Sequence, residues 1–157
     1  MAVYRVINSD GKYKDDYAVH DVLHYVVSKA APDSVVGGAV LPGIAEISMK
    51  GVAKAYGKDK GTRLRHSVLS FDPNDCITPR QAKDIAQQAL DYYQDDYQIL
   101  AAVHEDKDHL HIHFAMNSVN YRNGSKYRGK KDDYYRFIGH MNKALQSYGI
   151  RVHPAKK

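Results

Sequence analysis

The stretch HEDKDHLHIHFAMN, residues 104–117, ends in a segment from His109 that alternates polar and apolar side chains and predicts a central strand of a sheet. Successive side chains of a strand point to opposite faces, so its apolar side chains share one face: Leu110, Ile112, Phe114 and Met116. Its polar side chains share the other: His109, His111, His113 and Asn117. We therefore expect one face of the sheet to pack on helices and the other to carry a site.

Four of the nine histidines lie in this stretch, and imidazoles two residues apart on one strand face can converge on one metal ion. If His104 pairs opposite His111, then His104, His111 and His113 surround one point. If His104 pairs with His109 instead, His113 lies roughly 13 Å away, too far to share the ion. We predict His104, His111 and His113 as ligands, with coordination positions left open for a substrate, and His109 at the rim, beside the ligands or the substrate.

An acidic side chain accompanies the histidines. Asp106 is two residues from His104 and can orient a ligand imidazole by accepting a hydrogen bond from its other ring nitrogen. It can also take a proton from a nucleophile, so Asp106 is a candidate catalytic residue.

The remaining chain alternates between helix-like and strand-like segments. Apolar spacing predicts helices over 16–30, 43–57 and 132–149. A further helix, between the second and the last of these, is predicted to start with a capping box at Thr78. Alternation predicts strands over 2–7, 62–71, 97–104 and 109–119, and an Asn-Gly pair at 123–124 indicates a hairpin. The expected fold is α+β: a central antiparallel sheet with helices packed on one face and the metal site on the other.

Length and composition favour one globular domain over residues 1–157. Hydrophobic residues make up 43% of the chain, and no linker or low-complexity run divides it. The lone cysteine excludes an intramolecular disulfide framework, and no apolar run is long enough to cross a bilayer. We expect a cytoplasmic protein without membrane insertion.

The net charge of +5 permits binding to a polyanion. Positive charge concentrates in residues 54–66 and 121–131, and the second segment has tyrosines between its cations, as a groove for single-stranded nucleic acid would. Tyr127 is a candidate for base stacking. The candidates for contacts to the phosphate backbone are cations: Arg63, Arg65, Lys126, Arg128, Lys130 and Lys131.

The histidine stretch resembles a known signature. Six positions reproduce the pattern H-x-D-x-x-H-x-H-x-H-x-x-x-N of relaxases, the HUH endonucleases that mobilise plasmids and integrative conjugative elements: His104, Asp106, His109, His111, His113 and Asn117. The resemblance extends over residues 17–150, through VLHYVV (22–27), RHSVLSF (65–71) and NSVNYRNGSKY (117–127).

The resemblance implies a palm-like HUH fold and a metal-dependent nick at an origin of transfer, which starts conjugative DNA transfer. A tyrosine becomes joined to the 5′ phosphate and leaves a free 3′ hydroxyl. The implied ion is Mn or Mg, whereas imidazole ligands alone also suit Zn, Ni or Co. The resemblance also implies a monomer. Its implied partners are single-stranded or locally melted origin DNA, relaxosome accessory proteins and type IV coupling proteins. His66 resembles a family histidine and is a candidate for a phosphate or active-site contact.

Tyr25 is the candidate nucleophile among thirteen tyrosines. It sits about 120° from the apolar stripe of the first helix, so the core does not need it, and it matches the tyrosine motif of relaxases. Tyr134 and Tyr135 are rivals, because rolling-circle replication initiators carry their nucleophile on a helix after the histidines. Two alternatives therefore stay open: such an initiator, and a non-catalytic nucleic-acid module that binds metal.

Overall fold

The computed structural model describes residues 1–7, 13–15, 17–31, 33–105 and 109–155. Within these residues the strands are β1 (Ala2–Val6), β2 (Val35–Gly38), β3 (Leu64–Ser70), β4 (Ile99–Glu105), β5 (Leu110–Asn117) and β6 (Val152–Pro154). The α-helices are α1 (Ala18–Ser28), α2 (Ala45–Ala55), α3 (Pro79–Leu90) and α4 (Lys131–Leu145). Short 3₁₀ turns occupy Pro42–Ile44, Pro73–Asp75 and Gln146–Tyr148.

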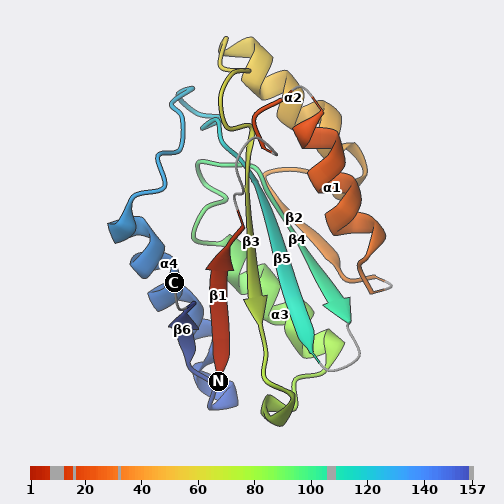
Figure 1. Cartoon of the computed structure of the whole chain (residues 1–157), viewed down its shortest axis with the longest axis vertical. Coiled ribbons are helices and arrows are strands. Elements are labelled where there is room, and N and C mark those ends of the chain that lie inside the picture. Colours follow the sequence, from red (N-terminus) through yellow and green to blue (C-terminus); the bar gives the residue numbers. More distant parts are fainter. Residues whose placement is uncertain (8–12, 16, 32, 106–108, 156–157) are drawn as a thin grey trace.

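The strands form one sheet in the order β2-β4-β5-β3-β1-β6 (Figure 1). Neighbouring strands are antiparallel except β1 and β6, which are parallel. The predicted α+β class and antiparallel centre are confirmed. The two edge strands β2 and β6 were not predicted, because each is very short and VVGG and VHP contain glycine or proline in place of alternating strand formers.

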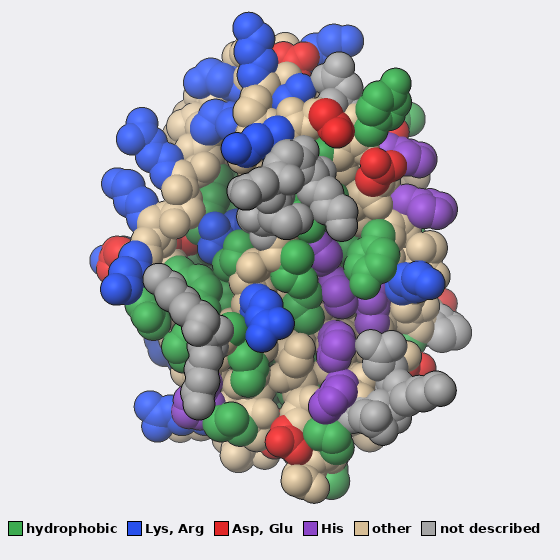
Figure 2. All heavy atoms as spheres, viewed as in Figure 1, with side chains coloured by type: hydrophobic (Ala, Val, Ile, Leu, Met, Phe, Trp, Pro, Cys, Tyr) green, Lys and Arg blue, Asp and Glu red, His purple; other side chains and the backbone are tan. Residues whose placement is uncertain are grey.

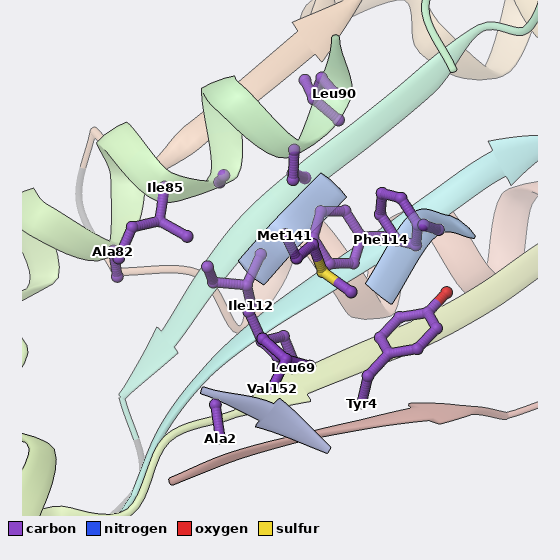
Figure 3. Packing of buried hydrophobic residues seen from close by; sticks show 14 of the residues in the cluster. Ala2, Tyr4, Leu69, Ala82, Ile85, Leu90, Ile112, Phe114, Met141 and Val152 are labelled. Atoms are coloured by element: carbon purple, nitrogen blue, oxygen red, sulfur yellow. The ribbon is translucent and has the colours of Figure 1, made fainter. Parts of the chain in front are cut away.

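The register at the centre of the sheet agrees with the prediction that places His104 opposite His111. On the other side of β5, His113 lies opposite Val68 of β3. The same alternation puts Ile112, Phe114 and Met116 into the core with α3 and α4, as predicted. Figure 3 shows Ile112 and Phe114 of β5 in this core, with Ile85 of α3 and Met141 of α4.

The helices differ from the prediction in their distribution, because they cover both faces of the sheet. α3 and α4 pack on the Phe114 face, whereas α1 and α2 pack on the histidine face. The apolar stripe of α1 lies over small side chains of the sheet, including Ala102 and Ala115. These alanines leave room for a helix, and Leu64 and Leu100 extend the apolar part of the same face, so α1 shares that face with the histidines.

The helix signals were accurate locally. Thr78 and Gln81 form the predicted capping box at the start of α3, with both reciprocal hydrogen bonds present. The Asn-Gly segment forms a turn closed by a single bridge between Val119 and Lys126, rather than a hairpin of two strands. No helix in the described part of the chain is both long and apolar enough to span a membrane.

Candidate active site

Tyr25 of α1 lies at the centre of a group of three histidines from three strands. Its ring centroid is 5.8 Å from the rings of His104 and His113 and 6.1 Å from that of His66, with its plane steeply inclined to each. The neighbouring residue Val26 is fully buried, whereas Tyr25 is 47% exposed. α1 therefore anchors Val26 in the core and presents the adjacent Tyr25 both to solvent and to the histidines.

The backbone of α1 also fixes one of these histidines. His104 Nε2 donates a hydrogen bond to the carbonyl oxygen of Val26, at 2.7 Å. A carbonyl can only accept, so the hydrogen of a neutral His104 ring is on Nε2 and the lone pair is on Nδ1. This hydrogen bond therefore ties α1 to β4 and holds the His104 imidazole beside Tyr25.

The histidines follow one line across β4 and β5, visible as the row of histidine side chains in Figure 2. The rings of His104 and His113 stack at 3.9 Å, and those of His111 and His113 are 6.1 Å apart. His109 continues the line, 6.0 Å from His111. Imidazoles suit a divalent transition-metal ion. As arranged, no group of three or more His, Cys, Asp or Glu side chains among the described residues has the geometry to hold one.

A buried hydrogen-bonded chain supports His113 from behind. Tyr13 Oη is 3.1 Å from His66 Nδ1, and His66 Nε2 is 2.9 Å from His113 Nδ1. If His113 donates to His66 and His66 donates to Tyr13, the Nε2 lone pair of His113 remains available as a ligand. This is the arrangement in which an outer partner orients a metal-binding imidazole.

Burial, and then the neighbouring His104, His66 and His111, lower the pKa of His113 to about 2. His113 is therefore neutral at any physiological pH. A neutral imidazole is the form that can ligate a metal ion.

A hollow of about 720 Å³ opens over these side chains. Tyr25 and the rings of His104, His111 and His113 line one part of it. Arg5 of β1 and Lys29, just after α1, contribute cations to its wall. A solvent-accessible tyrosine, imidazoles and cations around one hollow are suited to a phosphodiester.

Comparison with known proteins agrees with this chemistry. The family described as "Relaxase: MobA/VirD2-like, nuclease domain" matches residues 20–150. The chain belongs to this family. It is a relaxase nuclease domain, and the enzyme class predicted from the histidine signature is confirmed.

Individual relatives match parts of the domain. "Protein rlx" of Staphylococcus aureus is 35% identical over 77 residues, which are 49% of this chain and 24% of that protein. A second "Protein rlx" of the same organism is 31% identical over 87 residues, 55% of this chain and 27% of the relative. "Group II intron-interrupted relaxase LtrB" of Lactococcus lactis subsp. cremoris is 35% identical over 94 residues, 59% of this chain and 16% of the relative. The matched part of the chain spans about a quarter or less of these relatives.

Two other predicted site residues of the relaxase domain are Asp106 and Asn117, and only Asn117 is among the described residues. Asn117 is buried four residues along β5 from His113, where its amide donates to the carbonyl of Met49 and to the side chain of Gln98. These contacts join β5 to α2 and to the start of β4, so Asn117 holds the scaffold together.

Two predicted DNA contacts of the relaxase domain are engaged internally. Lys126 Nζ donates to the carbonyls of Lys60 and Thr62 and to Ser118 Oγ. These three hydrogen bonds use all three hydrogens of the Lys126 ammonium group. The Tyr127 hydroxyl donates to Asp133, and its ring is covered by neighbouring side chains. Both groups therefore already have partners within the described structure, and their contact with DNA stays a prediction.

The other predicted cations have different settings. Arg63 is partly buried and its guanidinium approaches the carbonyls of Lys14 and Gly61. The guanidinium of Arg65 lies 4.8 Å above the ring of Tyr127. The remaining three are exposed, two just before α4 and one at its first residue: Arg128, Lys130 and Lys131.

The rival tyrosines are on the other side of β1 from the histidine line. Tyr134 donates its hydroxyl to the carbonyl of Tyr4, and burial is the main cause that raises its pKa. Tyr135 is exposed and its ring packs edge-on against that of Tyr134. Both line a hollow that contains none of the histidines from β4 and β5.

Sequence reasoning missed Tyr13, Arg5 and Lys29 as parts of the site. The alternation in AVYRVI could have placed Arg5 on the face opposite the buried Tyr4. Its position near the histidines depends on β1 pairing with β3, which is a contact across more than sixty residues of chain.

Proposed function

We propose that this relaxase domain nicks one DNA strand at an origin of transfer and remains joined to it through Tyr25. The observation that carries the proposal is the position of Tyr25, in contact range of three histidines and open to solvent. In the proposed step the Tyr25 oxygen attacks the scissile phosphorus. The bond to the 3′ oxygen breaks, the 5′ phosphate stays on Tyr25, and the leaving 3′ oxygen takes a proton.

A divalent ion is part of this proposal, with His104, His111 and His113 as the residues that would hold it after their rings turn from the described arrangement to converge on one point. When bound there, such an ion would neutralise a phosphate oxygen and favour the charge that builds during displacement. The contact of His104 with Val26, and that of His113 with His66, keep these two rings beside Tyr25. Mn or Mg follows from the family resemblance, and the imidazole donors are equally suited to Zn, Ni or Co.

The proton of Tyr25 needs an acceptor, because an ordinary phenol with a pKa of about 10 is almost entirely protonated near pH 7. We propose Asp106 for this role, on its sequence position two residues after His104. His109 and His66 are proposed to stay beside the reacting group, with His66 acting through His113.

Attack by Tyr25 is better supported than attack by a tyrosine of α4. The hydroxyl of Tyr134 is bonded to a carbonyl of β1, and Tyr135 lies in the same hollow as Tyr134, away from the histidine line. A rolling-circle replication initiator would need one of these two to reach the histidines. We therefore propose conjugative transfer, in the cytoplasm, with origin DNA, relaxosome accessory proteins and type IV coupling proteins as partners.

The test does not require the origin sequence. A pool of random single-stranded oligonucleotides labelled at the 3′ end is incubated with protein and Mn²⁺, and labelled protein is detected on a denaturing gel. The wild type is expected to form an adduct that EDTA prevents. Tyr25→Phe should form none, whereas Tyr134→Phe, Tyr135→Phe and the exposed control Tyr17→Phe should form it normally.

The same gel separates the alternatives. An adduct that persists in Tyr25→Phe and disappears in Tyr134→Phe or Tyr135→Phe would identify an initiator-like nucleophile. A complete absence of adduct, despite binding of the same pool, would identify a non-catalytic module. Sequencing of the captured strands from the wild type gives the preferred nick site.

A further inference from the structure

A second hollow, of about 810 Å³, opens at the edge of β1 beside the histidine hollow. Its walls come from distant parts of the chain: Arg5 of β1, Arg65 of β3, and Lys131, Tyr134 and Tyr135 of α4. Within the described residues, β6 pairs with β1 only over Ala2 to Tyr4, so no described strand lies beside this edge of β1 from Arg5 onward. The hollow lies at this open edge, and its volume is in the range of small-ligand sites.

The hollow has an excess of positive charge. No acidic side chain in the described ranges forms an ion pair with Arg5, Arg65 or Lys131. Arg65 Nε is buried and has no hydrogen-bond partner among the described residues. Three cations without acidic partners around one concavity favour an anionic ligand.

The hollow also has an aromatic wall. Tyr134 is held in place by its hydrogen bond to Tyr4, and Tyr135 packs on it with ring planes 86° apart and centroids at 5.3 Å. Tyr135 is 49% exposed, so a ring that is fixed on one side remains open on the other. Cations beside an open aromatic ring are the combination that binds single-stranded nucleic acid.

Arg5 connects this hollow to the histidines, because it lines both. Val68 of β3 pairs with Arg5 on one side and with His113 on the other, so the three residues form a row across the sheet. Residues directly opposite each other share a face, and two strand spacings put the Cα atom of Arg5 about 10 Å from the Cα atom of His113. A strand lying over the histidines can therefore reach the second hollow by crossing Arg5.

We propose that the second hollow binds nucleotides that flank the scissile phosphate, an inference that rests on the proposed function. The DNA strand passes from Tyr25 over Arg5, sets phosphates against Arg5, Arg65 and Lys131, and stacks a base on Tyr135. Tyr135 is then a binding residue for single-stranded DNA.

Fluorescence anisotropy with labelled oligothymidines of four and twelve nucleotides tests this proposal. The measurements use Tyr25→Phe protein, so that binding is observed without cleavage. Loss of one stacked base predicts that Tyr135→Ala weakens binding of the twelve-nucleotide probe by roughly 5- to 100-fold. Loss of one phosphate contact predicts that Arg5→Gln lowers the slope of log affinity against log salt by about 0.7.

Two variants outside the hollow serve as matched controls. Arg136→Gln removes a cation from α4 that pairs with Asp132 and does not line the hollow, and Tyr17→Ala removes a more exposed tyrosine. Both should bind the probe as the parent does. Circular dichroism should show the same folded content in all variants.

Unchanged affinity and salt slope in both Arg5→Gln and Tyr135→Ala would overturn the proposal. So would losses that are equal for the four- and twelve-nucleotide probes, because the second hollow is needed only by the longer strand. If the wild type forms no covalent adduct and these losses still appear, the proposed nicking activity fails and the DNA subsite stands.

Discussion

Tyr13→Phe removes one hydroxyl from the buried chain that supports His113. Tyr13 is buried and its oxygen is 3.1 Å from His66 Nδ1, so the change removes this hydrogen bond from a buried imidazole. Loss of such a partner costs about 1–3 kcal/mol in the free energy of unfolding. Loss of a direct outer partner of a ligand histidine typically weakens metal affinity by roughly 10- to 100-fold. Tyr13 acts one hydrogen bond further out, through His66, so we expect Tyr13→Phe to weaken Mn²⁺ affinity by about 10-fold or less.

Two measurements separate these effects. Urea unfolding monitored by circular dichroism gives the free energy of unfolding in EDTA, and titration with Mn²⁺, followed by electron paramagnetic resonance of the free ion, gives the dissociation constant. Tyr17→Phe removes an exposed hydroxyl and should change neither by more than about 0.5 kcal/mol. If Tyr13→Phe destabilises the domain but leaves the Mn²⁺ affinity unchanged, the chain from Tyr13 to His113 has only a structural role and our reasoning is refuted.

Three further predictions concern pH, stability and metal. The pKa of His113 in the folded state is below its unfolded value of about 6.5, so the unfolded chain binds more protons as the pH falls. The free energy of unfolding in EDTA should therefore fall by about 1 kcal/mol per pH unit between pH 6.5 and 5. His113→Gln should flatten this slope when unfolding is measured in urea. Asp133 accepts hydrogen bonds from three tyrosines, so Asp133→Ala should cost about 3 kcal/mol in the same assay, whereas the exposed Asp132→Ala should cost less than about 0.5 kcal/mol. Removal of divalent ions with EDTA should abolish the adduct, and a series of Mn, Mg, Zn, Ni and Co in the gel assay should restore it with at least one ion; restoration by none would contradict a metal-dependent step.

Strand alternation was enough to predict the face that the histidines share, because the pattern HLHIHF is local to one strand. It left two registers open for His104, opposite His109 or opposite His111. We chose His111 because only that register brings three imidazoles around one point, and the structure has this pairing.

The covering of the histidine face by α1 and α2 was harder to predict. The expectation of a bare face came from its histidines and Asn117, while Ala102 and Ala115 on the same face were the signal for a packed helix. A single small residue in a polar pattern is weak evidence in sequence. Its meaning becomes clear only once β4 and β5 place the two alanines side by side.

The DNA contacts could not be assigned from residue type. Lys126 is a cation in a basic segment, but its hydrogen-bond acceptors come from carbonyls more than sixty residues earlier. Arg5 lies outside both basic segments, yet it pairs with Val68, which in turn pairs with His113 on its other side. Long-range strand pairing decides which cations face the site, and the sequence does not reveal that pairing for β1.

The most direct test of our account is to locate the DNA on the protein. The covalent adduct is digested with nuclease and trypsin, and the peptide that carries a residual nucleotide is fragmented in a mass spectrometer. We predict the nucleotide on Tyr25, in the peptide of residues 15–29, DDYAVHDVLHYVVSK. A nucleotide on Tyr134 or Tyr135 would contradict the proposed active site.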